Sequence, residues 1–145
     1  GAINQHATES PGSDVVVVGS YLRENEPYLG LWPGLSTVKE GGTLVMVNDC
    51  PDGDINHWLF NRHGKTIGAS LWNPKPQRLS KVRHMIIYGE YPLKSFMMRY
   101  DPEQVTWIKR WDEVLEELRN HHKAGSKVAV IPDGTSCIPE KALVR

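Results

Sequence analysis

The chain has 145 residues, 39% of them hydrophobic, and its 17 Lys and Arg residues balance 17 Asp and Glu residues. This length is typical of one compact domain, and the neutral charge excludes a general attraction to nucleic acid or to an anionic membrane. Cys50 and Cys137 are too few for a disulfide framework, and no apolar run reaches the about 20 residues of a membrane span. We therefore expect a cytoplasmic protein that binds neither nucleic acid nor a membrane.

The domain is expected to begin after a polar segment. Residues 1–13 lack apolar periodicity, which predicts a flexible lead-in or the remnant of an expression tag. Residues 14–139 are expected to form a single α/β domain, and residues 140–145 a C-terminal tail.

The first predicted elements alternate between strand and helix. Residues 14–20 are a β-branched run that predicts a strand buried on both faces, and residues 43–47 predict a second one. A helix is expected within residues 26–39, where Pro33 predicts a kink or a later start. The pair Gly41-Gly42 is expected to stop this helix.

The middle of the chain predicts one strand and several shorter elements. Short helical segments are expected within residues 54–61 and 74–79. Residues 84–89 predict a third buried strand. Asp101 and Pro102 predict the start of a helix, with Asp101 as its N-cap and Pro102 at its first position.

The last third contains the clearest helix of the sequence. Residues 111–122 combine an apolar stripe with acids at the beginning and basic residues at the end, as the helix dipole favours. Residues 127–131 predict the last strand. This alternation predicts the α/β class: a Rossmann-like layered domain with a largely parallel central sheet flanked by helices.

Ligands of such sheets bind beyond the carboxyl ends of the strands. Four strand ends are small or polar here: residues 19–21, 48–53, 88–90 and 132–135. The densest group combines Asp49 and Asp52 with Cys50 and His57, which could serve as acid/base groups or anchor a metal or a ribose. Two simpler interpretations stay open: the acids form an Asx turn that caps the next helix, and Cys50 is a buried packing residue.

The histidines give no catalytic or metal site in the sequence. His121 and His122 lie at a helix C-terminus, where they complement the dipole, and His84 is interpreted as structural. His57 and His63 lack the spacing that places two ligands on one helix face. The chain has no P-loop, GxSxG or HExxH motif, so we assign no catalytic residue and no metal ligand.

Four stretches together resemble the C-terminal domain of the lactate racemase family, the enzymes that use a nickel-pincer nucleotide. They are DVVVVGSYLRENEPYLG (14–30), VKEGGTLVMVNDCPDG (38–53), DPEQV (101–105) and SKVAVIPDGTSCIP (126–139). The family combines an opening strand, a Gly-Gly before an apolar strand, and an acid-Cys-x-acid-Gly turn. It closes with Asp-Pro-Glu-x-Val, a helix and a Val-Ile-Pro-Asp-Gly strand end. The resemblance covers most of residues 14–139.

The resemblance implies a domain that closes the substrate and cofactor cleft of a racemase or epimerase of 2-hydroxy acids and is inactive alone. In the family, the nickel ligands, a cofactor-linked lysine and two acid/base histidines belong to an N-terminal domain. The expected partners are therefore that catalytic domain of the same polypeptide and a small-molecule substrate. No cofactor is expected in this chain, and the nickel-pincer nucleotide is expected in the full-length protein.

The resemblance also implies a set of cleft residues. They are Tyr21, Glu26, Asp49, Cys50, Asp52, Gly53 and Trp72. Glu26 and Leu29 occupy the places of the family's substrate-binding Gln and Lys, and the loss of a lysine weakens the hold on a substrate carboxylate. Residues 70–73 keep only Trp72 of the family's Asp-Gln-Trp-Gln, so Trp72 is either a cleft wall or a core residue. The alternative function is a stand-alone small-ligand or nucleotide-binding module that uses the same strand ends.

Overall fold

The computed structural model describes residues 11–51 and 75–137. The strands are β1 (Ser13–Gly19), β2 (Val38–Val47), β3 (Val82–Tyr88), β4 (Val105–Ile108) and β5 (Val128–Ile131). The helices are α1 (Tyr28–Thr37), α3 (Lys94–Met97) and α4 (Trp111–His121), with single 3-10 turns at η1 (Tyr21–Arg23) and η2 (Gly134–Ser136). Within these ranges, no helix has the length and apolar character to cross a membrane.

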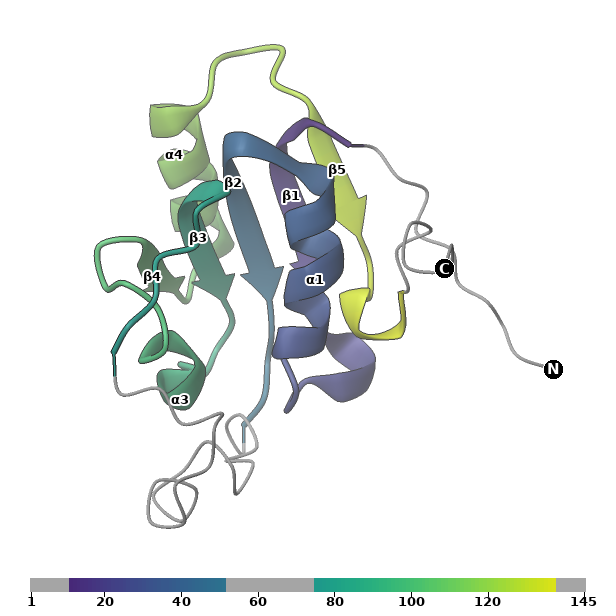
Figure 1. Ribbon diagram of the computed structural model, residues 1–145, viewed down its shortest axis with the longest axis vertical. Coiled ribbons are helices and arrows are strands. Elements are labelled where there is room, and N and C mark those ends of the chain that lie inside the picture. Colours follow the sequence, from purple (N-terminus) through teal and green to yellow (C-terminus); the bar gives the residue numbers. More distant parts are fainter. Residues whose placement is uncertain (1–10, 52–74, 138–145) are drawn as a thin grey trace, which may run out of the picture.

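All five strands are parallel, in the order β4-β3-β2-β1-β5 (Figure 1). The chain steps outward from β1 to β4 and then returns across the sheet through α4, so that β5 pairs with the other side of β1. This arrangement confirms the predicted α/β class with a parallel sheet flanked by helices. It also places the topological switch point, where the strand order reverses, at β1, the position where open α/β sheets form ligand-binding crevices.

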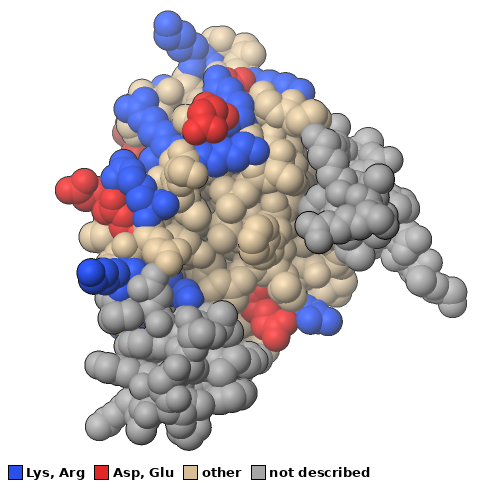
Figure 2. Space-filling model, viewed as in Figure 1, with Lys and Arg blue, Asp and Glu red and all other residues tan. Residues whose placement is uncertain are grey.

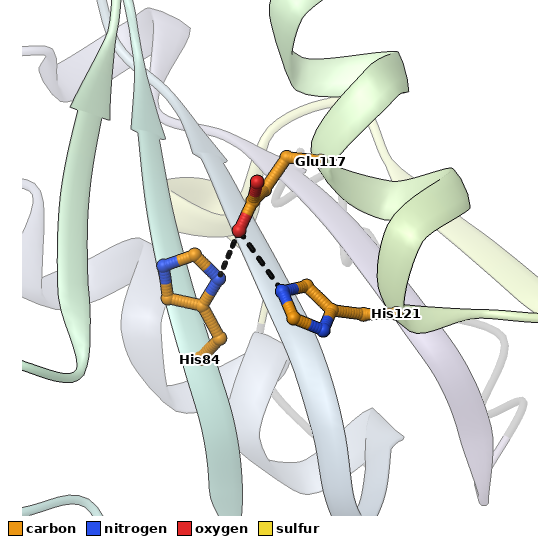
Figure 3. Close-up of side chains that lie close together, drawn as sticks. All are labelled: His84, Glu117 and His121. Atoms are coloured by element: carbon orange, nitrogen blue, oxygen red, sulfur yellow. Dashed lines mark hydrogen bonds and ion pairs between the residues drawn. The ribbon is translucent and has the colours of Figure 1, made fainter.

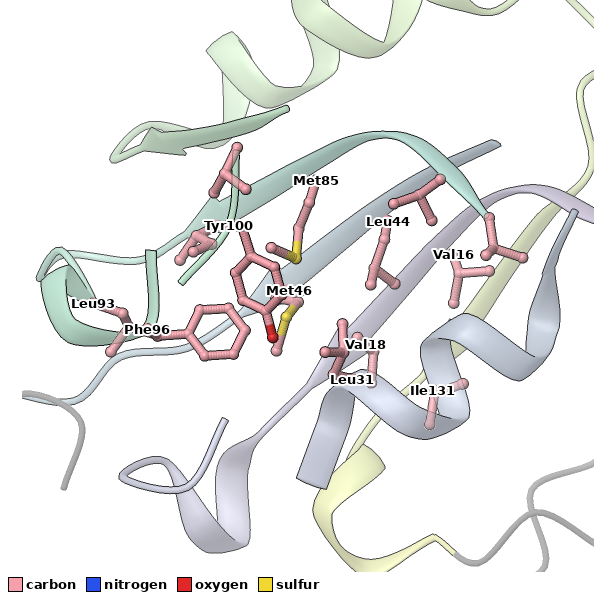
Figure 4. Packing of buried hydrophobic residues seen from close by; sticks show 14 of the residues in the cluster. Val16, Val18, Leu31, Leu44, Met46, Met85, Leu93, Phe96, Tyr100 and Ile131 are labelled. Atoms are coloured by element: carbon pink, nitrogen blue, oxygen red, sulfur yellow. The ribbon is translucent and has the colours of Figure 1, made fainter. Parts of the chain in front are cut away.

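Successive residues of each strand point their side chains to opposite faces of the sheet, as strand geometry requires. The larger core, shown in Figure 4, joins one face to α1 and α3 and includes Val16, Leu44 and Phe96. The smaller core joins the other face to α4 and includes Ile86 and Val114. The three inner strands are therefore covered on both sides, which explains their unbroken apolar runs.

Charged side chains secure the amino ends of the strands. The Asp14 carboxylate pairs with Lys39 and accepts a hydrogen bond from the Lys127 N–H at 2.7 Å. The hydrogen bond from Lys39 holds the pKa of Asp14 below its usual value. Lys81 donates to the Leu35 carbonyl oxygen at the end of α1, where a cation complements the helix dipole. Figure 2 shows Lys and Arg side chains gathered mainly toward the top and left of the face that carries α1.

The first helix is shorter than predicted, and the glycine pair does not end it. Helix α1 begins at Tyr28 and ends at Thr37, and it includes Pro33, so Pro33 does not delay the start of the helix. The prediction that Gly41-Gly42 stops the helix is wrong, because both glycines lie inside β2.

The glycine pair instead forms an irregularity in β2. The register with β1 moves from Ser13 opposite Val38 to Val15 opposite Thr43, so β2 has three residues more than β1 in this stretch. Gly41 has a φ of 71° and donates its N–H to the Lys81 carbonyl oxygen at 2.8 Å. A positive φ is a position that glycine adopts without strain, and glycine serves a strand bulge as readily as a helix end.

The helix predicted at Asp101 is absent, and the chain turns into β4 instead. The Asp101 carboxylate accepts from the Glu103 N–H at 3.0 Å, and the Asp101 carbonyl oxygen accepts from the Gln104 N–H at 2.9 Å. An Asx turn and a helix N-cap use the same carboxylate-to-N–H contact, so the local sequence does not distinguish them. The β-branched residues that follow favour the strand.

A second correction concerns the segment before β3. Of the predicted helix over residues 74–79, the described residues 75–79 are not helical, and Gln77 forms a bridge with Tyr100. The fully buried Gln104 side chain donates to the carbonyl oxygens of Leu79 and Val82 and accepts from the Leu79 N–H, all at 2.7 to 2.8 Å. These bonds replace the internal hydrogen bonds of a helix. The helical segment predicted within residues 54–61 lies outside the described residues.

The backbone approaches itself closely at the carboxyl ends of the strands. A Cβ atom on Gly19 would lie 2.1 Å from the Pro132 carbonyl oxygen, and one on Gly89 would lie 1.7 Å from that of Asn48. Only glycine fits at such distances. The glycines therefore let the loops after β1, β2, β3 and β5 come together at one edge.

Replacing Gly89 tests this packing. We expect Gly89→Ala to lower the free energy of unfolding by at least about 2 kcal/mol, because the new methyl group meets backbone that cannot rotate away. Gly30→Ala is the matched control, since a Cβ there has no neighbour closer than 3.6 Å and alanine favours the helix. Urea denaturation of both variants measures the effect, and equal stabilities would contradict the account.

Candidate functional site

A hollow of about 390 Å³ opens at the carboxyl ends of β1, β2 and β5. The residues that line it are Gly19, Ser20, Tyr21, Glu24, Val47, Asn48, Asp49 and Pro132. The hollow lies where the sequence placed strand ends at residues 19–21, 48–53 and 132–135. It is the crevice expected next to the topological switch point at β1, where the strand order reverses.

Hydrogen bonds extend the sheet one residue beyond its strands and fix the floor of the hollow. The Ser20 N–H donates to the Val47 carbonyl oxygen at 3.1 Å, and the Ser20 hydroxyl donates to the same oxygen at 3.2 Å. The Asn48 N–H donates to the Tyr88 carbonyl oxygen at 2.9 Å. Ser20 and Asn48 are thus held by backbone pairing, and each is only 2% exposed.

The Asn48 side chain connects the two strand ends to the loop after β1. Its amide donates to the Ser20 hydroxyl oxygen at 2.6 Å and to the Glu24 carbonyl oxygen. Its own oxygen, Oδ1, is buried and has no hydrogen-bond partner in residues 11–51 and 75–137. Leaving a buried acceptor unpaired costs about 1–3 kcal/mol, so a donor that reaches this oxygen when a ligand binds would remove that cost.

The charges around the hollow are negative. Glu24 and Asp49 contribute carboxylates, and the described lining contains no lysine, arginine or histidine. Asp49 also accepts a hydrogen bond from the Glu90 N–H at 3.2 Å, which ties the end of β2 to the end of β3. The described part of the hollow therefore offers a hydroxyl, an amide oxygen and carboxylates, and it lacks a cation to hold an anionic group.

The structure separates the predicted cleft residues into three groups. Tyr21 and Asp49 line the hollow. Glu26 is not among the lining residues and pairs with Arg23 at 3.1 Å. Cys50 is 2% exposed and belongs to the larger core, as its packing interpretation predicts. The remaining three lie outside the described residues: Asp52, Gly53 and Trp72.

Sequence reasoning did not single out Ser20, Glu24 or Asn48. Ser20 and Asn48 lay inside the strand ends that it marked, but small polar residues there are also ordinary turn residues. Which of them meet across strands depends on register, and the sequence does not fix the register.

A second group of polar side chains with metal-ligand chemistry lies on the opposite face, between β3 and α4 (Figure 3). The Glu117 carboxylate oxygen Oε1 is 3.0 Å from His121 Nε2 and 3.6 Å from His84 Nδ1. One possible metal-ligand atom from each of the three residues lies within 4.8 Å of the others. Two imidazoles and one carboxylate are a ligand set that proteins use for transition metals.

Neighbouring contacts orient the imidazole of His84. Its Nε2 atom is 2.9 Å from the Thr106 hydroxyl on β4, which leaves Nδ1 directed at Glu117. Burial lowers the pKa of His84, although the Glu117 carboxylate acts in the opposite sense. The lowered pKa favours the neutral imidazole, the form that binds metals.

Sequence reasoning separated these three residues. It assigned His84 a structural role and His121 a role at the helix end. The available signal was the pair Glu117 and His121, which are four apart and share a helix face with the apolar Val114 and Leu118. His84 lies two residues before Ile86 in β3, so its side chain points to the same face of the sheet, the face that α4 covers.

The comparisons with known proteins support the fold. No family model matches the chain, and no curated protein matches its sequence. A solved structure of the lactate racemase apoprotein from Thermoanaerobacterium thermosaccharolyticum superimposes with a TM-score of 0.60 at 18% sequence identity. The match covers 90% of this chain and 36% of that chain. This chain therefore has a lactate racemase-like fold and spans about a third of the length of that protein.

Truncating Asn48 tests whether its side chain holds the hollow together. We expect Asn48→Ala to lower the free energy of unfolding by about 1–3 kcal/mol, because the Ser20 hydroxyl and the Glu24 carbonyl lose their buried donor. Glu40, which is exposed on β2, is the control, and Glu40→Ala should change stability by less than about 0.5 kcal/mol. Chemical denaturation measures both, and a loss for Asn48→Ala no larger than that for Glu40→Ala would contradict this role.

Proposed function

We propose that this chain is the C-terminal domain of a lactate racemase-like protein and closes the cleft in which a 2-hydroxy acid is racemised or epimerised. The fold supports this proposal, since it matches about a third of a lactate racemase chain. The observation that carries it is the hollow at the strand ends, in which Asn48 presents a buried, unpaired acceptor. In this proposal, a substrate hydroxyl donates its hydrogen bond to Asn48 Oδ1.

The rim of the hollow has the character of a surface that packs against another domain. Tyr21 lines the hollow and is 82% exposed, and Leu22, which follows it in η1, is 64% exposed. Large apolar side chains that project from the edge of a site favour an interface. Docking of a catalytic domain here would cover both side chains and exclude water from the substrate.

In the proposal, the negative charges of the hollow determine which part of the substrate each domain binds. With Glu24 and Asp49 nearby and no cation in the described lining, this chain repels a substrate carboxylate. The carboxylate of a 2-hydroxy acid would therefore be bound by the other domain, while this domain binds the hydroxyl side and fixes orientation. The replacement of the family's Gln and Lys by Glu26 and Leu29 agrees with such a division.

The chemistry of the described lining also bears on the nickel-pincer nucleotide. Phosphates favour cations or helix N-termini and nickel favours imidazole or thiolate, and the described lining supplies none of these side chains. The hollow thus fits a hydroxylated substrate better than the cofactor. In the proposal, removal and return of the substrate hydrogen depend on that nucleotide in the other domain, and the residues of this chain orient the substrate and exclude water.

Expression of the whole gene product with its cofactor supply tests this function. We expect the full-length protein to carry the nucleotide and to racemise a 2-hydroxy acid, and this chain alone to do neither. Nucleotide content should be measured by mass spectrometry, because the His84, Glu117 and His121 group could hold a metal without any nucleotide. A polarimetric screen of 2-hydroxy acids measures the activity.

Substitution of Tyr21, which lines the hollow, tests whether racemisation depends on the hollow. Tyr21→Ala should lower racemisation at least about tenfold without changing nucleotide content, since a loosened cleft misplaces the substrate. Glu40→Ala, an exposed change near the amino ends of the strands, is the control and should leave activity unchanged. A gene that encodes no second domain, together with measurable affinity of this chain for a hydroxylated ligand, would favour the stand-alone binding module instead.

A further inference from the structure

His84, Glu117 and His121 converge from two elements that are far apart in the sequence. His84 belongs to β3, and the other two residues lie one turn apart on α4 (Figure 3). Helix α4 runs back across the sheet, so its last turn lies over the amino-terminal half of β3. The group is therefore on the opposite face from the larger core and at the opposite end of the strands from the hollow.

We propose that these three side chains form a binding site for a divalent transition metal, with zinc as the expected ion. Zinc is held by imidazole nitrogens and carboxylate oxygens at about 2.0–2.2 Å, so its ligand atoms lie about 3.3 Å from one another in a tetrahedron. The separations from Glu117 Oε1 are 3.0 Å to His121 Nε2 and 3.6 Å to His84 Nδ1, and one ligand atom from each of the three residues lies within 4.8 Å of the others. Small side-chain rotations are enough to reach coordination geometry.

The surroundings supply the second contact that a metal-binding histidine normally has. When the Nε2–H of His84 donates to the Thr106 hydroxyl at 2.9 Å, its Nδ1 lone pair faces the space shared with Glu117 and His121. Such a bond fixes the tautomer and the ring orientation of a ligand. Without an ion, the ring can take the other tautomer, in which Nδ1–H faces the Glu117 carboxylate and Nε2 accepts from the Thr106 hydroxyl.

The burial of the group favours an ion that keeps an open position. The His84 and Glu117 side chains are 14% and 32% exposed, and that of His121 is 35% exposed. Three protein ligands leave one tetrahedral position for water or for a group from another molecule. The bound ion would also connect α4 to β3 and so stabilise the smaller core.

Titration of the chelator-treated chain with Zn²⁺ tests the site. We expect one strong site by calorimetry, with affinity at least about tenfold lower in His121→Ala and in Glu117→Gln. His121 is partly exposed at a helix end, so its removal leaves the fold intact, which circular dichroism checks. Zn²⁺ should also raise the melting temperature of the wild-type chain by about 5 °C and leave that of His121→Ala unchanged.

Two further variants separate this site from general binding to histidine. His122 is adjacent in sequence, but its Nε2 contacts the Thr43 hydroxyl at 2.8 Å, so His122→Ala should bind Zn²⁺ like the wild type. Thr106→Val should weaken binding several-fold, and Thr106→Ser should restore it, as expected for a residue that positions His84. Equal affinity of the wild type and His121→Ala, or an equal loss in His122→Ala, would overturn the proposal.

Discussion

The close approach of the backbone at the carboxyl ends of the parallel strands is the constraint on which the rest of this structure depends. Glycines at positions 19 and 89 allow the loops after β1 and β3 to touch Pro132 and Asn48, where any side chain would collide. The backbone hydrogen bonds between neighbouring strands then continue one residue beyond the strand ends, through Ser20 and Asn48. Polar groups that would face water at the end of a looser sheet are thereby buried and aligned around one hollow.

This constraint connects the fold to its proposed function. A buried asparagine whose amide is used and whose oxygen is unpaired is costly within the chain, and a hydroxylated ligand would remove that cost. In the proposed function, the negative lining leaves the substrate carboxylate to a second domain, and that domain docks over the exposed Tyr21. The His84, Glu117 and His121 group lies at the other end of the sheet, so the two sites are expected to act independently.

The sequence predicts the strands better than it predicts the connections. Apolar runs such as residues 15–18 and 85–87 are long enough to indicate buried parallel strands, and the amphipathic pattern of α4 indicates its helix. Asp101 and the pair Gly41-Gly42 were misinterpreted, because an Asx turn resembles an N-cap and a strand bulge uses glycine as a helix end does. In these cases tertiary contacts, such as the buried Gln104 side chain, decide between local alternatives.

The site residues also depend on tertiary contacts that the local sequence does not encode. Strand ends can be marked from the sequence, so Tyr21 and Asp49 were found, but the pairing of Asn48 with Ser20 depends on register across 28 residues. His84 and His121 meet only because α4 crosses back over β3, which no local pattern encodes.

Hydrogen exchange of backbone amides, measured by mass spectrometry, tests the central claim most directly. It should be compared between this chain and the full-length protein that the proposed function requires. The account predicts slower exchange in the full-length protein at residues 20–24 and 48–49, where the second domain covers the hollow. Unchanged exchange there, with protection confined to the amino ends of the strands, would contradict it.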